Sequence, residues 1–332
     1  MTGMIFHNIL NPITYIITNS VCCHLSRRAL QSAGAIPQEE YNALYDLYNS
    51  TNGANWLWTP SLGVPWSFEN DSNPCDGWQG VLCYDTNPTF VEALHLSSMN
   101  LVGTLPASLS TLERLITLRA DSNVLSGTVP ETVYGIVNLT FLILDYNTIH
   151  GSISNEVCNL TLLQNLGFYN NTLTGTIPAC LDQLGNLSFI SLGFNHLTGT
   201  IPNTLGNMSY IKYLYLSNNL LHGTLPTSLS NLHHILYLEF NTNQLTGTIP
   251  IEYGNFVDVI YISFFENRLT GTIPNTFYNM SQLNSFVLGQ NDLSGTIPEY
   301  LGTLSLVSFI DLSYNHFNGT VPSNLGNLAI LQ

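Results

Sequence analysis

A repeat with a fixed period of 24 residues runs through most of this 332-residue chain. Stepping by 24 from Asn123 to Asn315 lands on asparagine nine times. The same step from Gly103 to Gly319 gives ten glycines, and the position three beyond each is proline in every copy except Ser154. Since no insertion or deletion interrupts the register, the pattern predicts a solenoid of ten full coils.

Each repeated position has a physical role, which the coil beginning at Leu187 illustrates. Leu187, Ile190 and Leu192 alternate with residues that point outward, which is the pattern of a strand with one buried face. Gly199 permits a backbone conformation that a side chain would obstruct. Asn195 falls at a turn inside the coil, where its amide can bond backbone groups of neighbouring loops. We therefore expect the asparagine series to be structural and not catalytic.

The motif LxxLxLxxNxLxGxIP with this period resembles the plant-type leucine-rich repeat, as found in receptor ectodomains and polygalacturonase-inhibitor-like proteins. The resemblance covers residues 90–332. It implies an α/β solenoid, a right-handed superhelix with a parallel β-sheet on the concave face and 3₁₀ or irregular segments on the convex face. Repeat physics requires much of the same, because one coil cannot bury its own apolar face and has to stack on its neighbours.

The repeat divides the chain into three segments. Residues 1–37 are a signal or leader segment, although the interrupted apolar run also allows a mis-assigned start or a structural extension. Residues 38–89 form an N-terminal cap. Residues 90–332 form the solenoid, with ten full repeats and the start of an eleventh but no C-terminal cap. Either the chain is truncated there, or another molecule covers the open edge.

Four cysteines are expected to form two disulfides. The segment NPCDGWQGVLC resembles the plant-type cap, and this resemblance implies a bond between Cys75 and Cys83. Cys158 and Cys180 lie at nearly equivalent positions of successive coils, within reach of a disulfide. The resemblance supports that bond, and two buried free thiols are the alternative. No cysteine or histidine group has zinc spacing, so we predict no metal site and no cofactor.

Charge and glycosylation motifs indicate where such a chain works. Its formal net charge is −15, which argues against nucleic acid and anionic membranes as partners. No segment reads as a membrane span. Nine Asn-x-Ser/Thr motifs favour the secretory pathway and N-linked glycans, hence an extracellular protein, secreted or at the cell surface. Their asparagines are Asn49, Asn70, Asn138, Asn159, Asn170, Asn186, Asn207, Asn279 and Asn318.

No motif points to catalysis. The chain has neither a glycine-rich phosphate loop nor a nucleophile elbow. Carboxylates such as Asp145 and Glu239 fall on or beside the strands, and we interpret them as solvated charges of the concave face and not as an acid–base pair. We predict that the protein is not an enzyme.

Aromatic residues gather at outward-facing strand positions, where packing of the coil does not require them. An exposed aromatic stripe usually marks a contact surface. The alternative is that aromatic residues merely suit strands and shield the sheet. We predict a partner-binding surface formed by Phe141, Phe189, Tyr213, Tyr215, Tyr237, Tyr261, Phe265 and Phe309.

Three functions fit these features. The favoured one is a recognition module that binds protein, peptide or glycan through the concave face. The second is a structural glycoprotein that assembles end to end into filaments through the uncapped edge. The third is ice binding, suggested by Thr-Gly-Thr steps that His150 and His222 interrupt. Those steps occur at Thr174/Thr176, Thr198/Thr200, Thr246/Thr248 and Thr270/Thr272.

Overall fold

The computed structural model describes residues 35–69 and 72–331. Most of the predicted leader segment, residues 1–34, and the glycosylation motif asparagine Asn70 lie outside this range. The described chain opens with the α-helix α3 (Gln38–Ser50) and the 3₁₀ turn η1 (Gly53–Asn55), which precede the first strands.

Eleven strands form one long sheet. The first pair, β1 with β2, is antiparallel, and later neighbours are parallel with a constant step of 24 residues, as in Phe189 opposite Tyr213. The constant step keeps each column of side chains aligned from coil to coil. In sheet order the strands are β1 (Val81–Cys83), β2 (Val91–His95), β4 (Thr117–Arg119), β6 (Phe141–Ile143), β8 (Asn165–Gly167), β10 (Phe189–Ser191), β11 (Tyr213–Tyr215), β13 (Tyr237–Glu239), β15 (Tyr261–Ser263), β17 (Ser285–Val287) and β19 (Phe309–Asp311).

A second set of short strands follows the asparagine turn of most coils. These are β3 (Val102–Thr104), β5 (Val124–Ser126), β7 (His150–Ser152), β9 (Thr172–Thr174), β12 (His222–Thr224), β14 (Gln244–Thr248), β16 (Arg268–Gly271), β18 (Asp292–Thr296) and β20 (His316–Asn318). The last five pair in parallel into one sheet.

A 3₁₀ turn then starts the return path of each coil. These turns are η2 (Ala107–Thr111), η3 (Glu131–Gly135), η4 (Asn155–Asn159), η5 (Ala179–Gln183), η6 (Asn203–Asn207), η7 (Thr227–Asn231), η8 (Ile251–Asn255), η9 (Asn275–Asn279), η10 (Glu299–Thr303) and η11 (Ser323–Asn327). Proline precedes nine of them because it has a fixed φ and no N–H to leave unpaired. Before η4 the residue is Ser154, whose hydroxyl accepts a hydrogen bond from the Glu156 N–H at 3.2 Å and so caps the turn.

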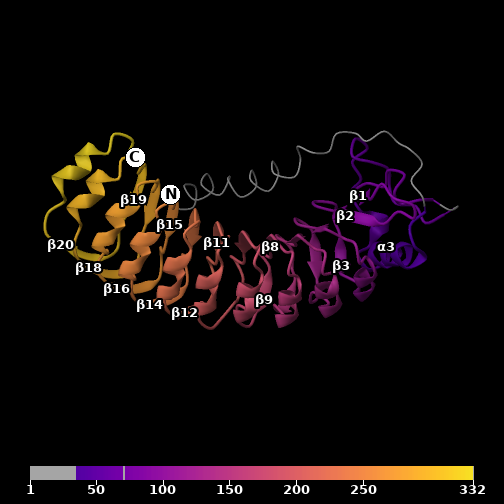
Figure 1. The fold of residues 1–332 in the computed structure, drawn as a ribbon, viewed down its shortest axis with the longest axis horizontal. Coiled ribbons are helices and arrows are strands. Elements are labelled where there is room, and N and C mark those ends of the chain that lie inside the picture. The colour runs from indigo at the N-terminus through magenta and orange to yellow at the C-terminus, as the bar shows by residue number, and fades with distance from the viewer. Residues whose placement is uncertain (1–34, 70–71, 332) are drawn as a thin grey trace.

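The coils stack side by side along a curved axis, from the cap around α3 to the last coils at β20 (Figure 1). The labelled strands β8, β11, β15 and β19 lie along the inner side of this curve. The expected solenoid with a parallel concave sheet and a 3₁₀ return side is thereby confirmed.

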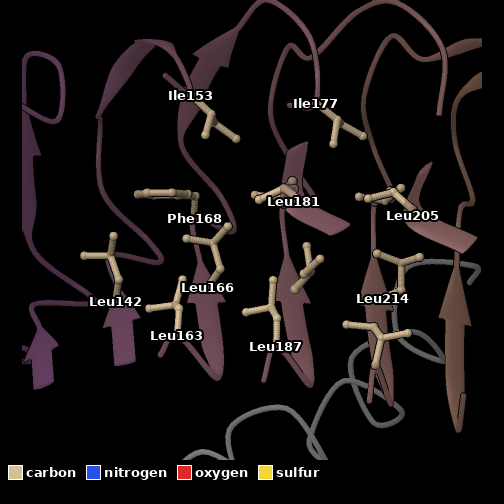
Figure 2. Packing of buried hydrophobic residues seen from close by; sticks show 14 of the residues in the cluster. Leu142, Ile153, Leu163, Leu166, Phe168, Ile177, Leu181, Leu187, Leu205 and Leu214 are labelled. Atoms are coloured by element: carbon tan, nitrogen blue, oxygen red, sulfur yellow. The ribbon is translucent and has the colours of Figure 1, made fainter. Parts of the chain in front are cut away.

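The core consists of aligned columns of apolar side chains, one contribution per coil (Figure 2). Leu142, Leu166 and Leu214 occupy equivalent strand positions, and each is fully buried. Burying a leucine side chain contributes roughly 1.5–3 kcal/mol. Because every coil adds several such residues against its neighbours, the core extends with the chain and does not need a globular centre.

The asparagine series joins each coil to the one before it. In the coil that begins at Leu187, the Asn195 Nδ2 donates to the Phe168 carbonyl of the preceding coil at 2.8 Å and to the Leu192 carbonyl of its own coil at 3.1 Å. Its Oδ1 accepts from the N–H of Leu173 at 2.9 Å. The same bonds recur from Asn123 to Asn315, so the structural role expected for this series is confirmed.

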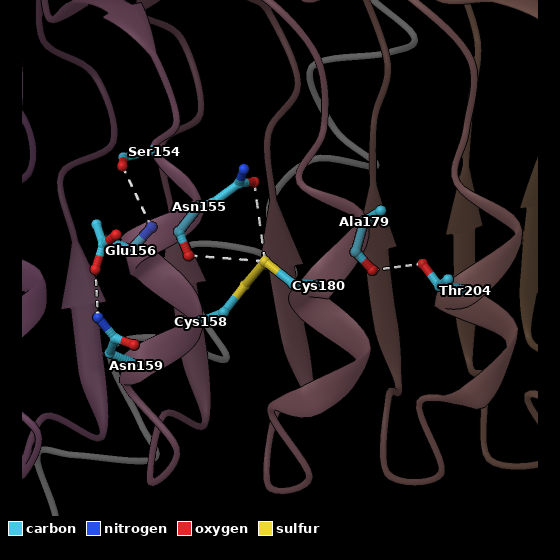
Figure 3. Close-up of a disulfide and its surroundings, with 8 residues drawn as sticks. All are labelled: Ser154, Asn155, Glu156, Cys158, Asn159, Ala179, Cys180 and Thr204. Atoms are coloured by element: carbon cyan, nitrogen blue, oxygen red, sulfur yellow. Dashed lines mark hydrogen bonds between the residues drawn. A yellow bond between two sulfur atoms is a disulfide. The ribbon is translucent and has the colours of Figure 1, made fainter.

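Within the described residues, one disulfide lies in the cap and another joins two coils. Cys75 and Cys83 are bonded, with 5.7 Å between their Cα atoms, which confirms the disulfide of the N-terminal cap. Cys158 and Cys180 are also bonded, with their Cα atoms 6.0 Å apart, and they connect η4 to η5 in the next coil (Figure 3).

A buried carboxylate attaches the cap helix to the first repeat. Glu40 of α3 is 2% exposed, and its Oε2 accepts a hydrogen bond from the backbone N–H of Val91 at 2.8 Å. Burial raises the pKa of Glu40 to about 7, although the bond from Val91 acts in the opposite direction. The tryptophans Trp56, Trp66 and Trp78 pack beside this helix at 4% exposure each, as the core of the cap.

Candidate binding surface on the concave face

Five aromatic side chains form one continuous cluster on the concave face. Their rings contact one another from coil to coil, with centroid separations of 5.9 Å between Phe189 and Tyr213, 5.5 Å between Tyr213 and Tyr237, and 6.0 Å between Tyr237 and Tyr261. Tyr215 completes the group at 5.7 Å from Phe189. We call Phe189, Tyr213, Tyr215, Tyr237 and Tyr261 the aromatic cluster.

The aromatic cluster is less exposed than the sequence suggested. Phe189 and Tyr215 are each 2% exposed and Tyr261 is 6% exposed, so the expectation of a fully exposed stripe is wrong for them. The reason is that neighbouring strands lie only about 4.8 Å apart, and large rings on adjacent strands cover each other. Tyr213 and Tyr237 are half-buried and present part of their rings to the concave space.

The other three predicted contact residues lie apart from this cluster in the sheet register. Phe141 occupies the same column as Phe189, but Asn165 separates the two. Phe309 is separated from Tyr261 by Ser285 in the same way. Phe265 follows the end of β15, four residues after Tyr261.

A second aromatic group borders the concave face at the carboxyl ends of the strands. The rings of Tyr146 and Tyr169 are 5.3 Å apart, and those of Tyr169 and Phe194 are 5.1 Å apart. Tyr146 is 48% exposed and Phe194 is 41% exposed, so these two side chains are the more accessible aromatic residues of this region.

Two of the carboxylates predicted to be solvated are in fact buried. Asp145 is 4% exposed, and its Oδ1 accepts from the Tyr169 N–H at 2.6 Å. Burial raises the pKa of Asp145 to about 8, which outweighs the effect of that hydrogen bond. Glu239 is 8% exposed, and burial raises its pKa to about 6. Large side chains on adjacent strands cover most of both residues, which the strand pattern alone did not reveal.

A threonine column that runs along and just beyond the second set of strands is more regular than the Thr-Gly-Thr steps alone indicate. The position five residues after the repeat asparagine carries threonine in every coil but one, without interruption by histidine. The threonine methyl of each coil lies close to the repeat glycine of the next coil. A Cβ placed on any of the repeat glycines from Gly199 to Gly295 would be only 2.8–2.9 Å from that methyl carbon. Because the methyl groups all point at the next glycine, the hydroxyls repeat in one orientation. This exposed column is Thr104, Thr128, Ser152, Thr176, Thr200, Thr224, Thr248, Thr272, Thr296 and Thr320.

Stepping by 24 from Thr200 would have found this column in the sequence.

The glycosylation motifs are well placed for modification, because all eight of their asparagines within the described chain are exposed. Asn159, Asn207 and Asn279 each end a 3₁₀ turn, on the return side of their coils.

Comparison with known proteins finds the same repeat in other chains. A family model described as Leucine Rich Repeat matches residues 186–208, 210–232 and 307–328. The chain thus contains repeats that the leucine-rich-repeat model recognises. A search of curated protein sequences found no significant match.

Solved structures similar to this chain include plant receptor ectodomains. One is the ectodomain of the receptor kinase GASSHO1/SCHENGEN3 from Arabidopsis thaliana, in complex with CASPARIAN STRIP INTEGRITY FACTOR 2, with a TM-score of 0.72 and 26% identity. That match covers 88% of this chain and 43% of the receptor chain. PEPR1, solved with AtPEP1, has a TM-score of 0.74 and 26% identity over 89% of this chain and 44% of its own. This chain thus spans less than half of either of those two chains.

A plant ice-binding protein is similar over nearly its whole length. The TM-score is 0.74 and the identity 25%, and the match covers 87% of this chain and 90% of the other. These likenesses confirm the plant-type repeat superhelix expected from the motif.

The described residues were also compared with the requirements of a metal site and of a membrane-spanning helix. Across residues 35–69 and 72–331, no group of three or more His, Cys, Asp or Glu residues could hold a metal ion. No helix within those ranges combines the length and the apolar character that a bilayer crossing requires.

Proposed function

We propose that this leucine-rich-repeat protein is a non-enzymatic recognition module that works outside the cell and binds a peptide or protein segment through the aromatic cluster. The observation that carries the proposal is the cluster itself, a set of touching rings across four adjacent coils of the concave sheet. Aromatic side chains supply much of the binding energy at protein interfaces. The similar receptors, one of them the plant peptide hormone receptor RGFR1 in complex with RGF2, support a peptide as the class of ligand.

Two disulfides and the exposed glycosylation motifs support the extracellular placement, since disulfides persist in oxidising compartments. We propose N-linked glycans at these exposed asparagines, where they would cover the outer surface and leave most of the concave face free. A glycan ligand for the concave face fits the stacking rings as well, but the receptor likeness favours a peptide.

The test is a peptide-library selection on the wild-type protein, followed by titration of the selected peptides against variants. Tyr237→Ala removes the central ring of the cluster, and we expect it to weaken binding by about tenfold or more. Tyr210→Ala is the control, because Tyr210 is 62% exposed and lies away from the concave strands. Peptides that bind both variants as tightly as the wild type would contradict the proposal.

Ice binding is a second candidate, favoured by the threonine column and by the likeness to a plant ice-binding protein. A column of threonines with one orientation, repeated at about 4.8 Å, offers an ordered array of methyl groups and hydroxyls. Thermal hysteresis in the wild type that is lost in Thr200→Tyr and retained in the return-side control Thr227→Tyr would support it. No hysteresis in the wild type would eliminate this candidate.

The end-to-end filament stays a prediction. Electron microscopy of the native protein addresses it directly, since regular filaments would support assembly and isolated curved particles would count against it.

A further inference from the structure

We propose that Glu239 and the tyrosines around it form a pocket for a cationic side chain, the guanidinium of an arginine in an extended peptide. This inference rests on the proposed function, because it specifies a chemical group of the ligand that the concave face would bind.

Glu239 lies at the centre of a block of outward-facing residues. Its partners at the same level of the sheet are Tyr215 on β11 and Ser263 on β15. Along its own strand, Tyr237 precedes it by two residues and Asn241 follows by two, and residues two apart share a face of the sheet. The corners of the block are Tyr213, Ser217, Tyr261 and Phe265.

The centre of this block combines two acceptors, the Glu239 carboxylate and the Asn241 amide oxygen, with the hydroxyls of Ser217 and Ser263 beside them. Within the described part of the chain, the Asn241 Oδ1 is buried without a hydrogen-bond partner, and the residue is only 9% exposed. Glu239 forms no ion pair with any described residue. A guanidinium has five N–H donors and no acceptor, so it complements this combination of carboxylate and amide oxygen.

Among residues 35–69 and 72–331, none supplies a cation to this position. Strands β10, β11, β13, β15 and β17 contain no lysine, arginine or histidine. Lys212 directly precedes β11, at the opposite end of that strand from Tyr215, the partner of Glu239. A buried carboxylate without a counter-ion is costly, and a ligand cation would relieve that cost.

The rings favour arginine over lysine. Tyr213 and Tyr237 are nearly parallel, with an interplanar angle of 27°, and Tyr237 and Tyr261 follow at 23°. A planar guanidinium stacks on aromatic faces while it donates two hydrogen bonds to a carboxylate, whereas an ammonium is a compact and strongly hydrated charge. Tyr213 and Tyr237 are half-buried, so part of each ring remains open to contact by such a flat cation.

Among the titratable groups of this block, Glu239 is the one that is charged at pH 7. Its pKa is about 6 because burial raises it, while the nearby Ser217 hydroxyl acts in the opposite direction. The facing titratable groups are tyrosines, and burial raises the pKa of each above its ordinary value, so they are neutral at pH 7. These are Tyr169, Tyr213, Tyr215, Tyr237 and Tyr261. Protonation of Glu239 then competes with the cation, and affinity falls as pH drops below about 6.

The experiment uses N-acetyl-arginine amide as the probe and N-acetyl-citrulline amide as its uncharged isostere. Saturation-transfer NMR at about pH 7.5 should show binding of the arginine probe about tenfold tighter than that of the citrulline probe. Glu239→Gln should abolish this preference, and Glu239→Asp should retain part of it. Glu252→Gln, at an exposed carboxylate on the return side, is the control and should bind like the wild type. At about pH 5 the wild-type preference should fall by about tenfold, as expected for a carboxyl group with this pKa.

The outcomes separate this inference from the proposed function. If Glu239→Gln retains the arginine preference, or if both probes bind the wild type equally, the cationic pocket is wrong even where Tyr237→Ala still abolishes binding of library peptides. If library peptides bind Tyr237→Ala as tightly as the wild type, the proposed recognition through the concave face is wrong, whatever affinity the small probes show. Circular dichroism of Glu239→Gln establishes that the variant is folded.

Discussion

The repeat asparagine is the residue on which each coil depends most. Its side chain accepts one backbone hydrogen bond and donates to carbonyls of two coils, as Asn195 does with Leu173, Phe168 and Leu192. All of these backbone groups are buried, and a buried polar group without a partner costs about 1–3 kcal/mol. One asparagine side chain therefore supplies hydrogen-bond partners to backbone groups that have none in the sheet.

Asn195→Ala should lower the free energy of unfolding by about 2–5 kcal/mol, because it leaves the Leu173 N–H and the Phe168 carbonyl unpaired. Urea denaturation followed by circular dichroism measures the loss. Asn203→Ala is the matched control, because Asn203 is exposed at the start of η6. Equal stability of the two variants would mean that the ladder adds nothing beyond the strands.

At the scale of the element, neighbouring return segments differ in how they are held together. Most contact each other through packing and isolated hydrogen bonds, such as the bond from Thr204 Oγ1 to the Ala179 carbonyl (Figure 3). Between η4 and η5 the disulfide adds a covalent connection across 22 residues of sequence. It lies beside the one coil in which Ser154 replaces proline.

Replacing both Cys158 and Cys180 by serine should destabilise the protein by about 2–4 kcal/mol, because the disulfide restricts the unfolded chain. The Cys75–Cys83 pair encloses a shorter loop, with a separation of 8 residues against 22, and its removal should cost less on the same chain-entropy argument. Thermal melts of both double variants test the order. A smaller loss at Cys158–Cys180 than at the cap would contradict it.

At the scale of the whole molecule, buried carboxyl groups link stability to pH. Glu40 in the cap, Asp145 after β6 and Glu239 in β13 all have a pKa raised by burial, to about 7, 8 and 6. The folded state therefore holds more protons than the unfolded state between the ordinary pKa values and these raised ones. Stability from these groups is largest at acid pH and is lost as pH rises through the raised values.

The melting temperature should accordingly be several degrees higher at about pH 5 than at about pH 8.5. Asp145→Asn and Glu40→Gln keep an acceptor for the Tyr169 and Val91 N–H groups, and the double variant should reduce the difference between the two pH values. Exposed Glu131→Gln should leave it unchanged. A wild-type melting temperature that rises between the acid and the alkaline condition would show that the buried carboxyl groups do not dominate the linkage.

The sequence predicted the coil well because the repeat constrains it locally. Leucine, asparagine, glycine and proline recur at fixed positions, and each position has one physical role, so strand direction, core columns and the asparagine bonds followed directly. The cap disulfide followed from its resemblance to a known cap. Burial on the concave face did not follow, since it depends on which residues stand side by side across coils. Tyr215 and Glu239 illustrate this, because rings on adjacent strands cover most of both residues.

The direction of the asparagine bonds also bears on how the chain is made. The N–H of Leu173 and the carbonyl of Phe168 are completed by Asn195 of the following coil, so a coil is not fully satisfied by its own residues. The chain leaves the ribosome amino terminus first, so the newest coil lacks these hydrogen bonds until the next coil has emerged. Folding during translation should therefore advance one coil behind the exit tunnel, starting from the disulfide-closed cap. A pause in synthesis would leave the polar backbone of one coil open to chaperones and not the whole solenoid.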